Sequence, residues 1–446
     1  MRPITDNTPW IDIREVGFNL EDIDNLQRIA NVPIEDLRLE HNPNLLVFPR
    51  DLGVYGDEIS ESEIIRLHGN QISTGNIMGF VGCKGTELSI KSRFAKNDPN
   101  DYFLHYLLQQ VFAINLFDLK HSTTKEAVFD FLLYLFPYFL KLALRQGVFR
   151  KYERREYNDS RVKGVIDTSR HIRYNIPFNG NVAYQCREYV YDNEITELIR
   201  HTIEFIKTKP QGAFVLENDL DTKNAVKAIL GVTPSYSARE RQTVISQNLK
   251  PVRHPYFDAY PKLQKLCIQI LRHESIKYGD SKDDVYGVLF DGAWLWEEYL
   301  NKQLTKLGFK HPQNKLHRGG IRMFKDDNQE LNFDSNKRRL YPDFYKENFI
   351  VDAKYKHLNS NLCREDLYQV VTYMYCTRSL YGAYVYPAEK QSDISWYRLA
   401  GYEDGNEGKM ALIPFYVPQD ANSWKDYRSE MSTSESSLLE SISHPR

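Results

Sequence analysis

Two aspartates and a lysine lie close together in the segment 341–354, which reads Tyr-Pro-Asp, a short polar turn, and then Phe-Ile-Val-Asp-Ala-Lys. Asp352 and Lys354 are two residues apart on an apolar run, and on a strand such residues point to the same face. A turn at 346–348 can bring Asp343 back beside them. Two carboxylates and an amine at one sheet edge suit a divalent metal ion and an attacking water. The segment therefore predicts the chemistry of a nuclease.

The residue types suggest a role for each group. Mg²⁺ takes hard oxygen ligands, usually one or two carboxylates together with water and substrate phosphate, and Mn²⁺ suits the same ligands. We expect Asp343 and Asp352 to supply the carboxylates and the backbone carbonyl of Ala353 to add a third oxygen. Lys354 is expected to orient the water or steady the phosphate, because an ammonium is a compact point charge. The alternative is a surface hairpin in which the Asp-x-Lys pair forms only an ordinary ion pair.

Two helices are expected to position these strands. The segment 290–300 has apolar residues at helical spacing and carries Glu297, which can point toward the metal ion or lie on a solvated face. The segment 365–373 predicts a second helix, on which Gln369 and Tyr373 share one face because they are four residues apart. There they can hold the lysine or a phosphate, and otherwise they are incidental polar groups on a core helix.

The order of these elements is more specific than any one of them. A helix with Glu, a strand after Pro-Asp, a strand with Asp-x-Lys, a helix with Gln-x-x-x-Tyr and the apolar strand 381–386 follow one another. This order resembles the PD-(D/E)xK nuclease superfamily, and the Gln-x-x-x-Tyr helix resembles its RecB-like branch. The resemblance implies an α/β domain like that of restriction endonucleases. Its site residues would be Asp343, Asp352, Lys354, Glu297, Gln369 and Tyr373.

Three further segments resemble the McrC subunit of McrBC-type restriction systems. They are Gly-Val-Phe-Arg-Lys-Tyr at 147–152, Arg-Val-Lys-Gly-Val-Ile-Asp at 161–167, and the helix entry 186–195, whose Asp-Asn-Glu wording departs from the family pattern. The resemblance spans roughly 75–417. It implies DNA cleavage that leaves a 5′-phosphate, and an N-terminal part that docks onto a McrB-like AAA+ GTPase ring. Taken alone, that N-terminal part can equally be a small β domain that shields the rest.

Composition places the chain among ordinary globular proteins. Of its 446 residues 41% are hydrophobic and 26% charged, and the net charge is −2. A nearly neutral chain must make phosphate contacts locally or through a partner. The best local cluster precedes Asp343, where we expect Arg318, Arg322, Arg338 and Arg339, with Lys325 and Lys337, to contact DNA rather than form a merely solvated face.

Several classes of function are disfavoured. The five cysteines form no Cys-x-x-Cys pair, so neither a zinc site nor a disulfide framework is indicated, and a reducing, cytoplasmic location fits. No signal peptide is recognisable, and the apolar run 131–144 is too short to span a membrane. No P-loop sequence is present, so we expect this chain itself to bind no nucleotide.

An α+β multidomain fold follows from a pass along the chain. We expect a β-rich partner-docking domain at 1–120, a mainly helical scaffold with a β-hairpin at 121–282, a nuclease domain at 283–417 and a flexible tail at 418–446. Within the scaffold, Asn179-Gly180 predicts a hairpin turn. The tail is rich in Ser and Glu and lacks an obvious apolar pattern over 429–446.

The main hypothesis is a metal-dependent DNA endonuclease subunit of a modification-dependent or related GTP-dependent restriction system. A second hypothesis is a non-catalytic adaptor that activates an AAA+ motor and carries a vestigial nuclease fold. A third is a RecB-like repair nuclease that acts without a GTPase. The presence of Asp343, Asp352 and Lys354 together argues against a decayed site. An adjacent gene for an AAA+ GTPase would favour restriction, and one for a helicase would favour repair.

Overall fold

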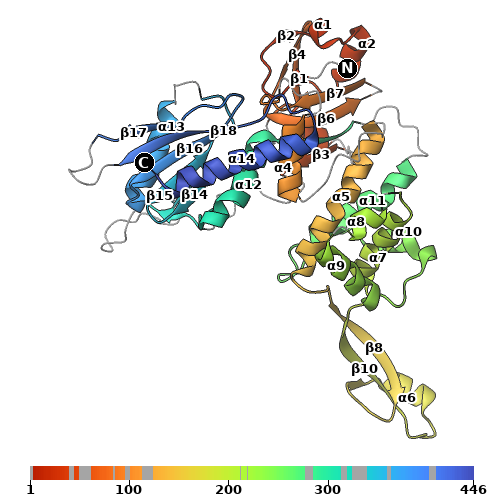
Figure 1. The fold of residues 1–446 in the computed structure, drawn as a ribbon. Coiled ribbons are helices and arrows are strands. Elements are labelled where there is room, and N and C mark those ends of the chain that lie inside the picture. The colour runs from red at the N-terminus through yellow and green to blue at the C-terminus, as the bar shows by residue number, and fades with distance from the viewer. Residues whose placement is uncertain are drawn as a thin grey trace, which may run out of the picture. The chain divides into compact units, whose positions relative to one another are not determined.

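The computed structural model shows a chain that mixes helices with several sheets (Figure 1). It describes residues 4–39, 45–49, 62–83, 86–95, 101–112, 124–210, 212–217, 219–276, 285–312, 319–323, 339–358, 363–400 and 408–445. These group into two compact units, the first combining 1–128 with 281–446 and the second being 129–280. The predicted α+β, multidomain class is confirmed.

A five-stranded sheet of order β1-β7-β6-β11-β3 forms the N-terminal part of the first unit. Its strands are Ile4–Thr5 (β1), Leu45–Phe48 (β3), Ile77–Cys83 (β6), Thr86–Lys91 (β7) and Tyr286–Asp291 (β11). β6 and β7 form a hairpin in which Cys83 lies opposite Thr86. β11 lies antiparallel to β6 and parallel to β3, although it begins the segment that we expected to be the nuclease domain. The chain therefore returns to its first sheet before the site begins.

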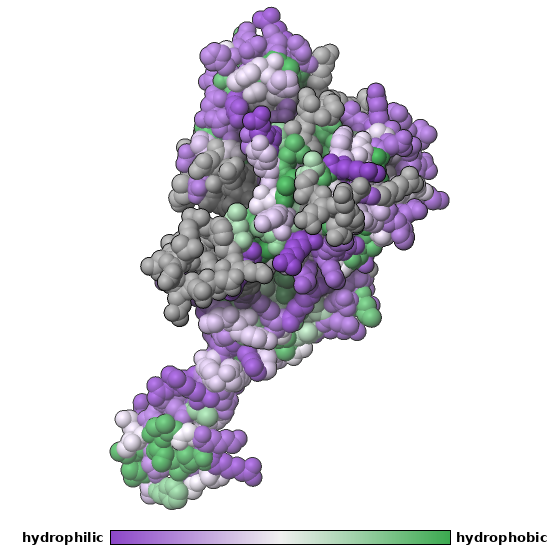
Figure 2. All heavy atoms as spheres, turned by 90° about the vertical axis from the view of Figure 1, so that its left-hand side faces the viewer, coloured by the Kyte–Doolittle hydropathy of each residue, from purple (hydrophilic) through white to green (hydrophobic). Residues whose placement is uncertain are grey.

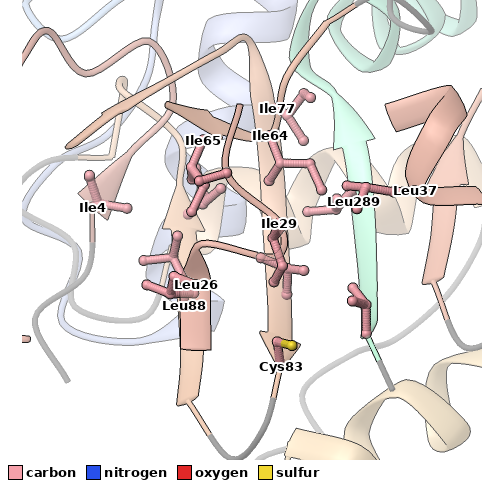
Figure 3. Close-up of a cluster of buried hydrophobic side chains, with 14 of the residues drawn as sticks. Ile4, Leu26, Ile29, Leu37, Ile64, Ile65, Ile77, Cys83, Leu88 and Leu289 are labelled. Atoms are coloured by element: carbon pink, nitrogen blue, oxygen red, sulfur yellow. The ribbon is translucent and has the colours of Figure 1, made fainter. Parts of the chain in front are cut away.

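The core of this sheet joins aliphatic side chains from distant segments. Figure 3 shows Ile4, Leu26, Ile77 and Leu88 near Leu289 of β11, and all five are fully or almost fully buried. Each such side chain contributes about 2 kcal/mol by leaving water. Short elements surround the core: β2 (Ile11–Asp12), β4 (Ile65–His68) and β5 (Gln71–Thr74) form a small sheet, with helices α1 (Ile13–Val16), α2 (Leu20–Leu26), α3 (Ile34–Leu39) and α4 (Tyr102–Phe112).

A second five-stranded sheet carries the segment with the predicted chemistry. Its order is β14-β15-β16-β18-β17, with strands Phe344–Lys346 (β14), Phe349–Ala353 (β15), Tyr381–Ala388 (β16), Ser395–Arg398 (β17) and Lys409–Tyr416 (β18). β15, β16 and β18 are parallel, and β14 and β17 are antiparallel edge strands. On one face Ile350, Tyr384 and Met410 pack against helix α13 (Arg364–Thr377). Helix α12 (Gly292–Leu304) also packs on the sheet, where the Trp296 Nε1–H donates to the Val385 carbonyl at 3.4 Å.

The expectation of a flexible tail at 418–446 is wrong. Residues Trp424–Ser443 form a helix, α14, whose first turn is capped by the side chain of Ser423. Its buried side chains recur at helical spacing: Tyr427, Met431, Leu438 and Ile442. Glu435 Oε1 accepts hydrogen bonds from Tyr106, Tyr299 and Gln303 at 2.8–2.9 Å. The many Ser and Glu residues lie between these contacts, so composition alone concealed an amphipathic helix.

The second unit is mainly helical. Its helices are α5 (Thr124–Leu144, which begins just before the unit), α7 (Glu194–Lys207), α8 (Gly212–Glu217), α9 (Leu220–Val232), α10 (Arg241–Gln247) and α11 (Tyr260–Ile276). They match the four long helical runs expected from apolar spacing. Asn193 caps α7 by accepting from the N–H groups of Ile195 and Thr196. In the part of the chain that the structure describes, no helix has the length and apolar content needed to cross a membrane.

A two-stranded arm extends away from these helices (Figure 1). It pairs the nine-residue strands Lys151–Asp159 (β8) and Val182–Val190 (β10), and its tip adds the short strand Val165–Ile166 (β9) and helix α6 (Thr168–Tyr174). The predicted hairpin turn at Asn179-Gly180 is wrong. Gly180 does adopt a left-handed φ of 86°, but no strand precedes it to pair with β10, whose partners are β8 and β9.

Candidate active site

The β14–β15 hairpin brings the two aspartates together. Lys346 pairs with Phe349, and between them Asn348 adopts a φ of 64°, a conformation that tight two-residue turns require. The register Phe344↔Val351 then places Asp343 opposite Asp352. The backbone N–H of Ala353 donates to Asp343 Oδ2 at 2.7 Å, which fixes the first carboxylate against the end of β15.

Lys354 lies between two carboxylates. Its Nζ is 2.8 Å from Asp352 Oδ2 and 3.1 Å from Asp366 Oδ1, in the first turn of α13. Its backbone N–H donates to the Val385 carbonyl at 3.0 Å, which continues the β15–β16 pairing by one residue. Asp352 is 2% exposed, so this ion pair is largely shielded from water. The shared face expected from strand alternation is what the structure shows for Asp352 and Lys354.

The end of β15 is held by Tyr355, the residue after Lys354. Its hydroxyl is 2.8 Å from Ser92 Oγ, and its ring meets the ring of Phe94 edge-on. A Cβ placed on Gly292, at the start of α12, would lie 2.6 Å from this ring, so only glycine allows α12 to begin there. The N-terminal sheet, α12 and the lysine-bearing strand therefore meet at one buried tyrosine.

The site concentrates negative charge in a buried place. Burial, and then the charge of Asp352, raise the pKa of Asp343 from its ordinary value of 3.8 to about 8. Burial also raises the pKa of Asp352, although Lys354 acts in the opposite direction. Burial opposes the charge of Lys354, but Asp352 and Asp366 outweigh it and hold the pKa of this amine above its usual value. Two carboxylates that each disfavour the other's charge are a natural receptor for a cation.

Glu297 joins this group from α12. Its pKa is raised well above the usual value by burial and then by the charges of Asp343, Glu298 and Asp352. Its Oε1 is 3.6 Å from Nε2 of His311, whose Nδ1 is 2.6 Å from the backbone carbonyl of Asp343. An Nδ1 that donates to this carbonyl directs Nε2 toward the glutamate.

The helix α13 contributes differently from the expectation. Gln369 and Tyr373 do share a face, and the Gln369 amide donates to the Tyr373 hydroxyl at 2.9 Å. The Tyr373 hydroxyl in turn lies 3.4 Å from the Tyr341 carbonyl, two residues before Asp343. These two residues therefore support the strand that leads into the site. Among the described residues of α13, the ion-pair partner of Lys354 is Asp366, which the sequence did not single out.

The predicted DNA-contacting arginines are described only in part. Arg322, in the short strand β12 (Ile321–Arg322), pairs with Arg339 of β13 (Arg339–Leu340). Arg318 and Arg338 lie outside the described residues, as do Lys325 and Lys337. The pairing places two of the four predicted arginines at one position, just before the Tyr341–Asp343 segment.

Two carboxylates fit a Mg²⁺ ion better than they fit a larger preassembled cage. Within the described parts of the chain, no group of three or more His, Cys, Asp or Glu side chains is arranged to hold a metal ion. Mg²⁺ commonly uses one or two protein carboxylates and completes its octahedron with water and phosphate. Asp343 and Asp352 meet that need, and their raised pKa values show an uncompensated negative site.

Comparisons with known proteins bear on the identity of the chain. None of the curated proteins compared matches it. A structure of Thermococcus gammatolerans McrB AAA+ hexamers with bound McrC is 14% identical, covers 96% of this chain and 99% of that chain, and has a TM-score of 0.45. A second structure, of the McrBC complex from the same organism, is 16% identical, covers 68% of this chain and 87% of that chain, and has a TM-score of 0.33.

The family match is more decisive than these distant likenesses. Residues 72–387 match the family described as McrBC 5-methylcytosine restriction system component. The matched range covers most of the chain and contains the β14–β15 hairpin together with α12 and α13. The chain therefore belongs to the family of McrBC 5-methylcytosine restriction system components.

Proposed function

We propose that this chain is the metal-dependent DNA endonuclease subunit of its restriction system and that its second sheet is a PD-(D/E)xK nuclease fold. The observation that carries the proposal is the convergence of Asp343, Asp352 and Lys354 at the end of β15. The order of the elements around them, α12, β14, β15, α13 and β16, supports it. Family membership supplies the biological setting.

The proposed chemistry is hydrolysis of a phosphodiester bond. Asp343 and Asp352 would hold Mg²⁺ with help from the Ala353 carbonyl. When bound, this ion supplies a Lewis acid that acidifies water and offsets charge on the phosphate. Lys354 donates to the attacking water or to a phosphate oxygen. The water oxygen forms a bond to phosphorus while the bond to the 3′ oxygen breaks, which leaves a 5′-phosphate.

Other residues keep these groups in place. Glu297 is an auxiliary acidic group beside His311, and Gln369 and Tyr373 support the strand that bears Asp343. Arg322 and Arg339 would meet the DNA backbone near this strand. These contacts position the groups that react, and the reaction needs no nucleotide bound to this chain.

We further propose that the chain acts with a McrB-like AAA+ GTPase ring. The arm supplies a surface suited to docking. Figure 2 shows apolar side chains gathered at its tip, and the large hydrophobic residues there are more than half exposed: Val165, Ile166, Ile172, Tyr174, Ile176 and Phe178. An exposed apolar cluster of this kind marks a protein interface more often than a free surface. We name these six residues the arm tip. The mark on the DNA would then be read by the partner.

Cleavage of plasmid DNA by the purified chain tests the proposal. We expect cutting that requires Mg²⁺, the partner ring and GTP together, and that is faster on DNA carrying 5-methylcytosine. The products should carry 5′-phosphates, which a ligase can rejoin without prior kinase treatment. Partner GTP hydrolysis that the chain stimulates without any DNA cutting, in Mg²⁺ or Mn²⁺, would instead identify the adaptor named as the second hypothesis.

A further inference from the structure

Asp366 is the one acidic residue of α13 whose side chain contacts the site lysine among the described residues. Its Oδ1 is 3.1 Å from Lys354 Nζ, and its Oδ2 forms an ion pair with Lys356. Its backbone carbonyl accepts a hydrogen bond from the Tyr384 hydroxyl of β16. Three contacts from two strand segments therefore fix a carboxylate that neither the sequence motifs nor the proposed reaction has yet used.

The structure contains a competition for Asp352. Lys354 Nζ is 2.8 Å from Asp352 Oδ2, the carboxylate that the proposed function assigns to the metal ion. A divalent ion bound to Asp352 weakens the hold of Asp352 on the ammonium, because the carboxylate charge is then shared with a stronger cation. A lysine released in this way would lose its position beside the phosphate, unless a second anion held it.

We infer that Asp366 is a positioning residue that retains Lys354 in the site while Asp352 binds the metal ion. The inference rests on the proposed function and extends it to a residue outside the Asp, Asp and Lys set. Asp366 accepts the ammonium on Oδ1, and Lys356 balances its other oxygen. The amine thus exchanges one carboxylate partner for another without leaving the strand end. A side chain that holds a reacting group in this way typically affects metal affinity or rate by about 10–100-fold.

The same geometry predicts what the loss of Asp366 does to metal binding. Without this second partner, Lys354 pairs with Asp352 alone and competes more strongly with Mg²⁺. The substitution Asp366→Asn should therefore weaken Mg²⁺ binding by about 10-fold and slow cleavage by about 10–100-fold. The variant Asp366→Glu, which retains the charge, should recover most of both losses.

Calorimetric titration with Mg²⁺ alone, in the absence of DNA and partner, tests the inference independently of cleavage. The matched control is Glu365→Gln, which removes the same charge from the same turn of α13 at an exposed position. It should change the Mg²⁺ affinity by less than about twofold, because a helix N-terminus responds only modestly to one exposed charge. Melting temperatures measured alongside show whether each variant folds.

A double-mutant cycle separates action through Lys354 from simple loss of negative charge. In a Lys354→Met background, Asp366→Asn should leave the Mg²⁺ affinity almost unchanged, because no amine remains to compete. An equal loss of affinity with and without Lys354 would overturn the inference and leave the proposed function intact. Failure of the wild-type chain to bind Mg²⁺ would overturn both.

Discussion

The active site and the arm tip depart from ordinary folding rules in opposite directions. At the site, the carboxylates of Asp343 and Asp352 lie in a buried place where their charges repel. At the arm tip, apolar side chains such as Val165 and Phe178 face solvent at 76% and 70% exposure. Buried polar groups and exposed apolar groups both cost folding free energy, so each marks a place where a ligand completes the structure. The difference indicates a cation and DNA at one end of the function and a protein at the other.

The largest effect should come from Asp352. We expect Asp352→Asn to reduce plasmid cleavage by on the order of 10³-fold, since it removes a metal ligand and the partner of Lys354 while retaining shape. Binding to the AAA+ partner should not change, because that contact belongs to the arm. The control Asp393→Asn, at an exposed position in the same unit, should cut normally. Normal cutting by Asp352→Asn would remove the site from the comparison altogether.

The arm tip should show the reverse pattern. The combined variant Val165→Ser, Ile176→Ser and Phe178→Ser should bind the partner at least about 30-fold more weakly, because buried apolar anchors dominate interface free energy. Its Mg²⁺ affinity should equal that of the wild type. Leu220→Ser and Leu249→Ser, which alter exposed leucines of the same unit outside the arm, provide the matched control. Equal partner affinity for both sets of variants would show that the arm tip is not the docking surface.

A smaller effect concerns the stability of the metal-free chain. The folded-state pKa of Asp343 is about 8, above its ordinary value of 3.8, so the folded chain holds this proton more tightly than the unfolded chain does. Stability from this group is therefore present at low pH and is lost as the pH rises toward 8. Asp343→Asn retains an acceptor for the Ala353 N–H and removes the charge. In EDTA it should raise the melting temperature by a few degrees at pH 8 and hardly at all at pH 4.

Thermal denaturation monitored by circular dichroism at the two pH values checks this sign. Lower stability of Asp343→Asn at pH 8 would mean that the carboxylate is compensated in the metal-free chain, and the site would then not be a charged receptor. Glu435→Gln serves as a contrast. Glu435 already accepts three hydrogen bonds, so its substitution should lower the melting temperature.

The smallest effect is expected from the paired arginines. Arg322→Ala and Arg339→Ala should each weaken DNA binding by a fewfold and reduce the slope of affinity against salt concentration by about one, as expected for a phosphate contact. Fluorescence anisotropy with a labelled duplex at several salt concentrations measures both quantities. An unchanged salt slope in both variants would assign this strand pair a structural role and leave DNA contact to other residues.

Local patterns explain what could be predicted from the sequence. The shared face of Asp352 and Lys354 follows from strand alternation, and the approach of Asp343 follows from a tight turn, so both needed only neighbouring residues. Asp366 and His311 were missed because their partners are fixed by tertiary packing, and a lone Asp or His carries no signal of its own. The place of β11 depends on pairing with strands some 200 positions earlier in the sequence, which no local period reveals.

Two errors share a different cause. In α14 the buried positions Tyr427, Met431, Leu438 and Ile442 keep helical spacing, but the Ser and Glu residues between them dominate the composition. At Asn179-Gly180 the local turn chemistry is real, as the φ of Gly180 shows, but the flanking chain pairs elsewhere. Composition and turn residues report local preference, and tertiary partners decide whether a segment packs or pairs.

Anomalous scattering from crystals of the chain grown with Mn²⁺ would test the central claim most directly, because it locates the ion without reference to activity. The account predicts a peak roughly 2.0–2.6 Å from carboxylate oxygens of both Asp343 and Asp352, with Lys354 Nζ retained by Asp366. Crystals of Asp343→Asn should lack the peak. A wild-type structure at saturating Mn²⁺ with no peak between these two aspartates would contradict the account.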